Sequence, residues 1–294
     1  MTLDAPTYED ISFEIVDQVA WLTIERPRFH NAFREHTLDE IVRALRSVRE
    51  ERTVVAVVIT GAGDKAFSAG GDFHAMMRLN RQNGHLWNER MLETAMTIRG
   101  LHVPVIAMVN GFCMGGGHEL ALWCDIVIAS DNAVFGQTGA KVGACPTVGA
   151  TQYLPRLIGE RRAREMIFFA RTFTAEEAVE IGLANLAVPQ AELRETTLAW
   201  CARLKGHSSQ TIRATKTSLN HESDELYASW RHGMELLNNI WGTEECLEGM
   251  NAFLEKRPPD FQRFRTANQE VVSEYLAGLV NGANQHPDAR VGAA

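Results

Sequence analysis

Alternating and continuous apolar runs divide the first part of the chain into strands and helices. Apolar and polar side chains alternate along 11–25 around Asp17-Gln18, a pattern typical of an antiparallel hairpin. Apolar positions then recur every three or four residues from Leu38 to Val48, as on one face of an amphipathic helix. The continuous apolar, largely β-branched run at 54–60 (VVAVVIT) predicts a strand that is buried on both faces.

The alternation of strand and helix continues further along the chain. A helix is predicted around 87–99, a strand at 103–109, a helix directly after three glycines and a strand at 125–130. Strands separated by helices indicate parallel crossover units, so the predicted fold class is α/β. Residues 160–182 and 191–204 add further predicted helices.

Beyond about residue 205 the pattern becomes purely helical and ends at Pro258 and Pro259. A last amphipathic segment, NQEVVSEYLAGLV, precedes a tail of small and polar residues. We therefore predict a core over 1–205, a helical region over 206–265, and an extra helix with a loose tail over 266–294.

Composition and charge narrow the class of protein. A chain of 294 residues with 45% hydrophobic content can bury a large core. The net charge of −8 argues against a nucleic-acid partner and against an anionic membrane surface. The start MTLDAPTYED has no signal pattern and no apolar run is long enough for a membrane span, so we expect a soluble, cytoplasmic protein. The five cysteines have no metal-ligand spacing, so we expect buried free thiols and no metal site.

Two glycine clusters stand at predicted junctions between a strand and a helix. Gly115, Gly116 and Gly117 precede one helix, and Gly70 and Gly71 follow the strand at 54–60. Free N–H groups and a positive dipole end at such a junction suit a phosphate or a developing oxyanion. The stretch GGGHEL lacks the Lys-Ser/Thr of a P-loop, and no G-x-G-x-x-G follows the first strand. Two backbone donors that converge on one oxygen, an oxyanion hole, are therefore the favoured interpretation.

Three stretches together carry a family resemblance: AFSAGGD, PVIAMVNGFCMGGGHELALWCDIVIAS and FGQTGAKVGACPTVGATQYLPRLIG. Over roughly residues 8–265 the chain resembles the crotonase, or enoyl-CoA hydratase, superfamily. The resemblance implies a spiral of ββα units with a C-terminal helical trimerisation region, and a homotrimer or hexamer. It also implies an acyl-CoA thioester as substrate, with no cofactor besides the coenzyme A that the substrate carries.

The resemblance also implies roles for particular residues. The N–H groups of Gly71 and Gly116 would polarise the thioester carbonyl and stabilise its enolate. Substrate contacts would come from Arg28 or Arg34, Ala32, Ala69, Phe253 and Lys256, the last two reaching coenzyme A from a neighbouring subunit.

The number of acidic side chains at the site decides which reaction we expect. An enoyl-CoA hydratase brings two glutamates to one water, because one group deprotonates the water and another delivers the α-proton. This chain resembles that pattern at Glu119, but Gly139 stands at the second position. A glycine cannot transfer a proton, so we expect space there for a ring or for its water, with Gln137 and Thr138 beside it and Trp241 closing the pocket.

The FGQTG-x-KVG pattern resembles most closely a subgroup with 1,4-dihydroxy-2-naphthoyl-CoA synthase and the hydrolases that open cyclic oxoacyl-CoA rings. The synthase fits poorly, because its tryptophan, aspartate and tyrosine align with Ile167, Pro146 and Trp241. We therefore expect a hydrolase in which Glu119 activates water and the thioester enolate is held by Gly71 and Gly116, in the breakdown of aromatic or alicyclic acids.

Several alternatives remain open at this point. The chain could be an enoyl-CoA hydratase whose second acid comes from elsewhere, or a non-catalytic assembly protein that binds CoA esters. Individual residues also have structural interpretations: helix capping for Glu119 and Asp72, packing for His74 and His118, a core position rather than a nucleophile for Cys145, and an interface anchor for Trp241.

Overall fold

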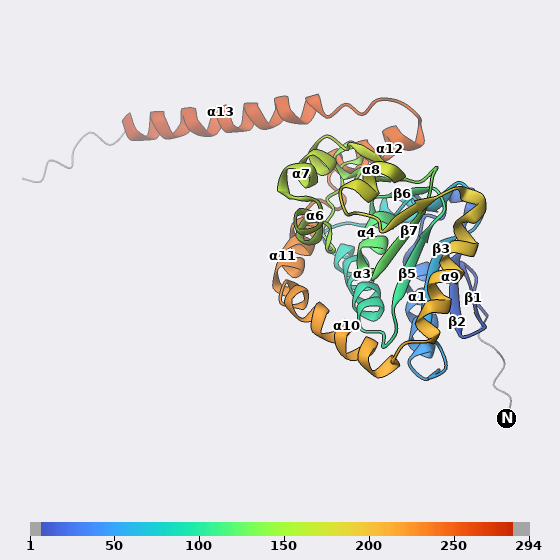
Figure 1. Cartoon of the computed structure of the whole chain (residues 1–294). Coiled ribbons are helices and arrows are strands. Elements are labelled where there is room, and N and C mark those ends of the chain that lie inside the picture. Colours follow the sequence, from blue (N-terminus) through green and yellow to red (C-terminus); the bar gives the residue numbers. More distant parts are fainter. Residues whose placement is uncertain (1–6, 285–294) are drawn as a thin grey trace, which may run out of the picture.

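The computed structural model describes residues 7–284, and their side chains up to residue 279. Its larger sheet has the strand order β1-β2-β3-β5-β7-β10 (Figure 1). These strands are Ile11–Val16, Val19–Ile24, Ala56–Gly61, Val105–Val109, Ile126–Ser130 and Leu186–Val188. Only β1 and β2 are antiparallel, and all other pairs in this sheet are parallel. The predicted α/β class and the predicted hairpin are confirmed.

The hairpin turn has a simple local cause. Asp17 and Gln18 both have positive φ angles, 49° and 66°, which is the backbone of a two-residue type I′ turn. The strand β3, by contrast, is buried along its whole length between β2 and β5. The prediction of a strand that is buried on both faces is therefore confirmed.

A second, smaller sheet was not predicted from the sequence. It has the order β4-β6-β8-β9, formed by Ala66–Ser68, Phe112–Met114, Val134–Gly136 and Thr172–Thr174. The strands β4, β6 and β8 run parallel, and β9 is antiparallel to β8. Each has three residues, which is too short for alternation to be visible in the sequence. This sheet matters for function because both glycine clusters follow its strands directly.

Helices cover the two sheets and connect their strands (Figure 1). The longer helices before residue 206 are α1 (Glu35–Val48), α3 (Gly84–Arg99), α4 (Gly116–Trp123), α6 (Ala150–Ile158), α7 (Glu160–Phe168) and α9 (Leu193–Lys205). Shorter ones are α2 (Phe73–Met76), α5 (Gly139–Val142), α8 (Ala175–Glu180) and the 3-10 turns η1 (Pro27–Phe29) and η2 (Gln190–Glu192). The helices expected after Leu38, around 87–99, after the glycines and at 191–204 are all confirmed.

The segment 160–182, predicted to be helical, forms two helices that are separated by a short strand. The chain leaves α7 at Phe168, passes through Ala170 with a φ of 47°, forms β9 and begins α8 at Ala175. The hydroxyl of Thr174 accepts from the N–H of Glu177, and the Glu177 carboxylate accepts from the N–H of Thr174. This capping box is the physical reason for a new helix start.

The C-terminal region is helical, as predicted, in α10 (Ser209–Asp224), α11 (Tyr227–Asn238) and α12 (Glu244–Leu254). The buried ammonium of Lys216 ties α10 to the sheet, because its Nζ lies 2.6 Å from Oδ2 of Asp125 and 3.0 Å from the carbonyl oxygen of Val103. Burial lowers the pKa of this lysine, while the Asp125 carboxylate opposes that shift.

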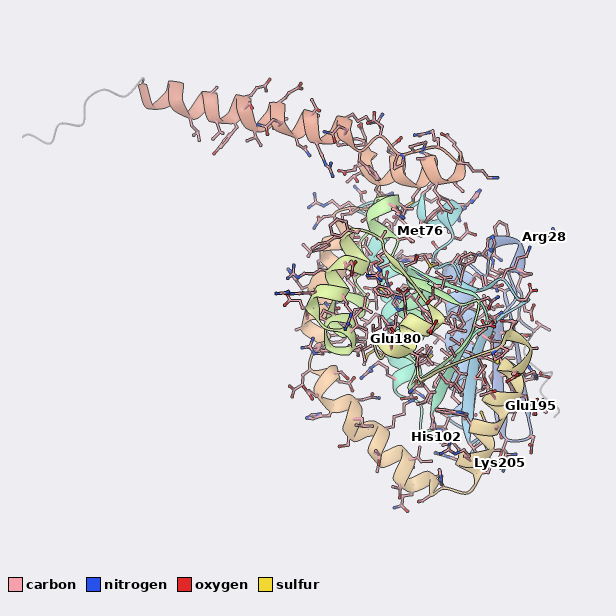
Figure 2. The ribbon with its side chains drawn as sticks, turned by 45° about the horizontal axis from the view of Figure 1, so that its top comes forward. Arg28, Met76, His102, Glu180, Glu195 and Lys205 are labelled. Atoms are coloured by element: carbon pink, nitrogen blue, oxygen red, sulfur yellow. The ribbon has the colours of Figure 1, made fainter. Side chains whose placement is uncertain are left out.

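Beyond the two prolines, α13 (Gln262–Asn284) runs away from the body of the molecule (Figures 1 and 2). Its exposed apolar side chains are Val271, Val272, Tyr275, Leu276 and Leu279. The tail predicted to be loose lies largely outside the described residues. No helix within the described range combines the length and apolar character needed to cross a bilayer.

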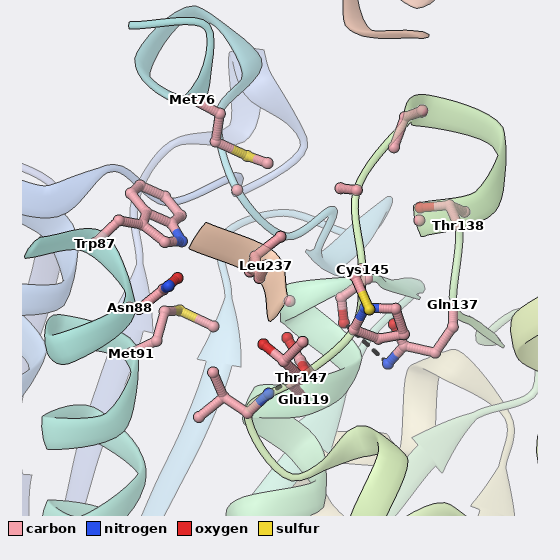
Figure 3. Close-up of a pocket in the computed structure, with 18 of the residues that line it drawn as sticks. Met76, Trp87, Asn88, Met91, Glu119, Gln137, Thr138, Cys145, Thr147 and Leu237 are labelled. Atoms are coloured by element: carbon pink, nitrogen blue, oxygen red, sulfur yellow. Dashed lines mark hydrogen bonds between the residues drawn. The ribbon is translucent and has the colours of Figure 1, made fainter. Parts of the chain in front are cut away.

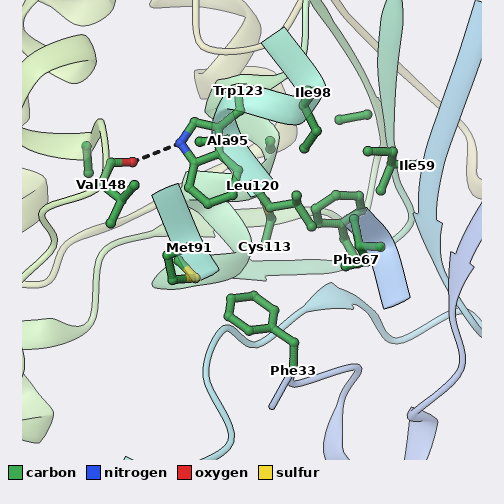
Figure 4. Packing of buried hydrophobic residues seen from close by; sticks show 14 of the residues in the cluster. Phe33, Ile59, Phe67, Met91, Ala95, Ile98, Cys113, Leu120, Trp123 and Val148 are labelled. Atoms are coloured by element: carbon green, nitrogen blue, oxygen red, sulfur yellow. Dashed lines mark hydrogen bonds between the residues drawn. The ribbon is translucent and has the colours of Figure 1, made fainter. Parts of the chain in front are cut away.

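The core connects the sheets to the glycine-bearing helix. Phe33, Phe67 and Trp123 are among its largest fully buried side chains (Figure 4). The indole Nε1 of Trp123 on α4 donates to the carbonyl oxygen of Val148 at 2.8 Å. This bond holds the segment before α6 against α4, and so fixes two parts of the chain that meet again in the cavity described next.

Candidate active site

A cavity lies where the parallel strands β4, β6 and β8 end. Each strand leads at once into lining residues, as expected for a ligand site at the carboxyl ends of parallel strands. The predicted site residues that line it are Ala69, Gly71, Gly116, Glu119, Gln137, Thr138, Gly139 and Trp241. Apolar side chains form much of the remaining wall: Phe33, Phe73, Met76, Trp87, Met91 and Leu237 (Figure 3).

The two glycine clusters pack against each other. Gly70 has a φ of 95°, and a Cβ on it would lie 2.8 Å from the backbone nitrogen of Gly116. A Cβ on Gly116 would lie 2.7 Å from Cζ of Phe33, and one on Gly117 would overlap the carbonyl oxygen of Ser68. The absence of side chains therefore lets the β4 and β6 ends approach as closely as they do.

Two N–H groups at this contact have no backbone partner among residues 7–284. Phe33 and Asp72 use their N–H groups to bond across the short bridge beside Gly71, to Gly70 and Phe33 respectively, each at 2.8 Å. Within residues 7–284, the N–H groups of Gly71 and Gly116 themselves donate no hydrogen bond to the backbone. Gly116 is also the first residue of α4, so the positive end of the helix dipole adds to its N–H. Both glycines line one cavity, which is the arrangement an oxyanion hole requires.

Glu119 brings a carboxyl group to the same cavity from the first turn of α4. Its residue is 6% exposed, and Oε1 accepts a 2.9 Å hydrogen bond from the N–H of Val148. Burial raises the pKa of Glu119 to about 8, although the N–H groups of Val148, Thr147 and Ala150 oppose the shift. A carboxyl group with a pKa in this range can both accept and return a proton near neutral pH.

Gln137 holds the glycine loop in place. Its Nε2 lies 3.3 Å from the carbonyl oxygen of Gly115 and 3.2 Å from Nδ1 of His118. Burial lowers the pKa of His118 to about 3, so its imidazole is neutral. Gln137 therefore orders the turn before α4, in addition to lining the cavity.

The main chain folds tightly beside Gly139, which itself lines the cavity. A Cβ at this residue would overlap the carbonyl oxygen of Ala144 and lie 3.3 Å from Cδ of Pro146. The cause is the tight fold of α5, in which the N–H of Ala144 donates back to the carbonyl oxygen of Gly139 at 3.0 Å. No side chain fits at this position, so Gly139 contributes only its main chain to the cavity, and the expected room beside it for a ring or a water remains a prediction.

The residues expected at coenzyme A lie outside the cavity. Arg28 is exposed on η1 (Figure 2), Ala32 is buried, and Arg34 is engaged by Asp10 through bonds of 2.7 and 2.9 Å. Lys256 follows the end of α12.

Phe253 is 62% exposed on α12 and packs edge-on against Phe73, a cavity residue, with the ring centroids 5.0 Å apart. The roles of Arg28, Ala32, Phe253 and Lys256 remain predictions.

Other candidates take structural positions. Asp72 caps α2 by accepting from the N–H of His74, and its carboxylate lies 2.9 Å from Nη2 of Arg26. Met76 lines the cavity, and Met77 packs against the core. Cys145 also lines the cavity, and burial together with the nearby Glu119 carboxylate raises the pKa of its thiol. No cluster of metal-ligating side chains occurs in the described part of the chain.

Comparisons with known proteins identify the family of this chain. Residues 14–264 match the family model described as enoyl-CoA hydratase/isomerase. An enoyl-CoA hydratase from Bacillus anthracis is 33% identical, with a TM-score of 0.71, 85% of this chain and 98% of that chain covered. An enoyl-CoA hydratase from Mycobacterium avium subsp. paratuberculosis is 26% identical, with a TM-score of 0.80 and coverage of 87% and 99%. An enoyl-CoA hydratase/isomerase from Xanthobacter autotrophicus is 28% identical, with a TM-score of 0.79 and coverage of 90% and 98%.

The chain therefore belongs to the enoyl-CoA hydratase/isomerase family, and it is a crotonase-type acyl-CoA enzyme. Most of α13 follows the last matched residue, so this helix is an addition to the shared fold.

Two polar side chains of the cavity were not anticipated from the sequence. Asn88 on α3 and Thr147 before α6 both line the cavity, and both are buried. Neither belongs to a glycine motif or a charge pattern. Only the three-dimensional arrangement brings α3 and the 147–148 segment to the same cavity as Glu119.

Proposed function

We propose that this enzyme uses water to open the carbon–carbon bond of a cyclic acyl-CoA that carries a ketone next to the α-carbon. The observation that carries the proposal is the combination of one buried carboxyl group, Glu119, with the free N–H groups of Gly71 and Gly116. Among the described residues that line the cavity, Glu119 is the only carboxylic acid. A reaction that needs one acid–base group therefore fits this site better than one that needs two.

The reaction can be written with these groups alone. Ionised Glu119 removes a proton from water, and the water oxygen attacks the ring ketone. The bond between the former ketone carbon and the α-carbon then breaks, and its electron pair forms the thioester enolate. The N–H groups of Gly71 and Gly116 stabilise the enolate oxygen. Glu119 finally gives its proton to the α-carbon, which leaves an open-chain acid attached to coenzyme A.

Hydration of an enoyl-CoA is the second candidate, because similar structures carry that name. It needs a second group to transfer a proton. Cys145 is the other titratable side chain among the described cavity residues, and its raised pKa keeps the thiol protonated. If hydration were the reaction, Cys145 would be the candidate for the second group.

Oligomerisation and coenzyme A binding complete the proposal. We expect a homotrimer or hexamer formed through the helices of 206–265, and coenzyme A contacts from Arg28, Ala32, Phe253 and Lys256. Size-exclusion chromatography with light scattering measures the first. Affinity for coenzyme A after single replacement of Arg28 or Lys256 measures the second.

The deciding experiment offers the protein 2-oxocyclohexanecarboxyl-CoA and crotonyl-CoA separately. We expect an open-chain product from the first and little turnover of the second. Glu119→Gln should reduce ring opening by about 10²–10⁴-fold and leave binding of the CoA ester intact. Cys145→Ala should retain ring opening.

Rapid hydration of crotonyl-CoA that disappears in Cys145→Ala would establish the second candidate instead. Tight binding without turnover of either compound would indicate a non-catalytic protein.

A further inference from the structure

One wall of the cavity contains a hydrogen-bond acceptor that the protein itself does not satisfy. Asn88 is 2% exposed, and its Nδ2 donates to the carbonyl oxygen of Met234 on α11 at 3.0 Å. Its Oδ1 is buried and has no hydrogen-bond partner among the described residues. Figure 3 places Asn88 between Trp87 and Met91, on the wall opposite Gln137.

The orientation of this amide is fixed by its other end. Because Nδ2 is bound to Met234, the group that remains is the carbonyl oxygen, which only accepts hydrogen bonds. A buried acceptor without a partner is costly, and native proteins rarely retain one unless a ligand or a water satisfies it.

The surroundings make this acceptor selective. Trp87, Met91 and Leu237 line the same part of the cavity, and none of them carries a charge. The indole N–H of Trp241, which also lines the cavity and has no partner among the described residues, is a donor, whereas Asn88 Oδ1 is an acceptor. Polar atoms in an apolar wall orient a ligand, because the wall accepts many shapes but each polar atom accepts only a matching group.

We propose that Asn88 is a specificity-determining residue that accepts a hydrogen bond from a hydroxyl group on the acyl ring of the substrate. The inference rests on the proposed function, in which a cyclic acyl group occupies this cavity. The ring ketone is not this partner, since a ketone oxygen has no proton to donate. The substrate class is therefore a ring-hydroxylated cyclic oxoacyl-CoA.

Thr147 lies in the same cavity, and its buried Oγ1 also has no partner among the described residues. A hydroxyl group both donates and accepts, so this residue tolerates either kind of ligand atom. The preference for a donor is therefore assigned to Asn88, and Thr147→Val tests the neighbouring position separately.

The test measures binding rather than turnover. Cyclohexanecarboxyl-CoA and its ring-hydroxylated isomers have no ring ketone, so the enzyme cannot open them. By isothermal titration calorimetry we expect at least one hydroxylated isomer to bind the native protein about tenfold more tightly than the plain ring. Asn88→Leu, which removes the acceptor at similar size, should abolish that preference. Met96→Leu, on the same helix but exposed and outside the cavity, should retain it.

Equal affinity of the native protein for the plain ring and every hydroxylated isomer would overturn the inference without any variant. A preference that survives in Asn88→Leu would overturn it too, and Asn88→Ala replaces this variant if it does not fold. Ring opening of 2-oxocyclohexanecarboxyl-CoA without a hydroxyl preference would leave the proposed function standing and remove only the role of Asn88. A preference without ring opening would retain the binding site and remove the proposed reaction.

Discussion

The N–H of Val148 donates a 2.9 Å hydrogen bond to Oε1 of Glu119. The donor lies just before α6 and the acceptor lies on α4, and the bond between Trp123 and the carbonyl oxygen of Val148 holds the same two segments together. The carboxyl group is thus oriented by a backbone that cannot move independently of its own helix. Burial still dominates its acidity and raises the pKa to about 8.

This pKa predicts the pH dependence of ring opening. Glu119 must be ionised to remove a proton from water, so kcat/KM should rise with pH and level off above about pH 8. Below pH 7 the decline should be about tenfold per pH unit, since kcat/KM reports the free enzyme. Initial rates measured from roughly pH 5.5 to 9.5, a range on both sides of this pKa, give kcat/KM as a function of pH. Cys145→Ala should give the same curve, and activity that falls through pH 8 would contradict a base role for Glu119.

The same residue predicts a change in stability with pH. The pKa of Glu119 is about 8 in the folded protein and 4.5 for an unperturbed glutamate, so the folded state retains a proton that the unfolded chain loses. The free energy of unfolding from this group should therefore be highest below about pH 4.5, decrease as the pH rises to about 8, and then stay constant.

Glu119→Gln lacks this dependence and retains an acceptor for Val148. At pH 9 it should be more stable than the native protein by on the order of 2–4 kcal/mol, and at pH 4 by little. Denaturant unfolding at both pH values checks the difference, and an unchanged difference would disprove the raised pKa.

Gly70→Ala should damage both stability and catalysis. The φ of 95° strains any side chain, and the new Cβ would lie 2.8 Å from the backbone nitrogen of Gly116. We expect a loss of about 1–3 kcal/mol in the free energy of unfolding, together with reduced turnover because the oxyanion donor shifts. Gly63→Ala is the matched control, since Gly63 also has a positive φ but has open space around it. This control should lose some stability and keep full activity; equal activity of the two variants would refute the role of the close approach.

Deletion of the chain from Thr266 onward should leave the two sheets, their helices and the cavity intact. The described side chains of α13 beyond that point are exposed and form hydrogen bonds only within the helix. The free energy of unfolding should change by no more than about 0.5 kcal/mol, as for surface changes without buried contacts. A deletion from Phe261, which also removes half-buried Phe264, should lower the melting temperature. A large loss of activity or stability in the shorter deletion would contradict this expectation.

The larger sheet followed from the sequence because burial on both faces leaves a continuous apolar run, as at 54–60 and 103–109. The smaller sheet did not, because three residues cannot display a period. The capping box of Thr174 and Glu177 was readable in advance, and it indicates a second helix start within 160–182.

Some residues of the candidate site could likewise be predicted from the sequence, and others could not. Gly71, Gly116 and Glu119 could be chosen because their motifs resemble a known family, and the structure places them around one cavity. Asn88 had no such signal: its significance depends on Met234 binding one end of its amide, a contact across 146 positions of the chain. The close approach of Ala144 to Gly139 could not be predicted from the sequence either, because it depends on the path of the main chain.

The close approach of Ala144 limits which side chains can stand at position 139. Replacing Gly139 by glutamate would drive the new side chain into the main chain of Ala144, so one codon change does not recreate a two-acid enzyme from this one. The loop from α5 to Pro146 would have to be rebuilt at the same time.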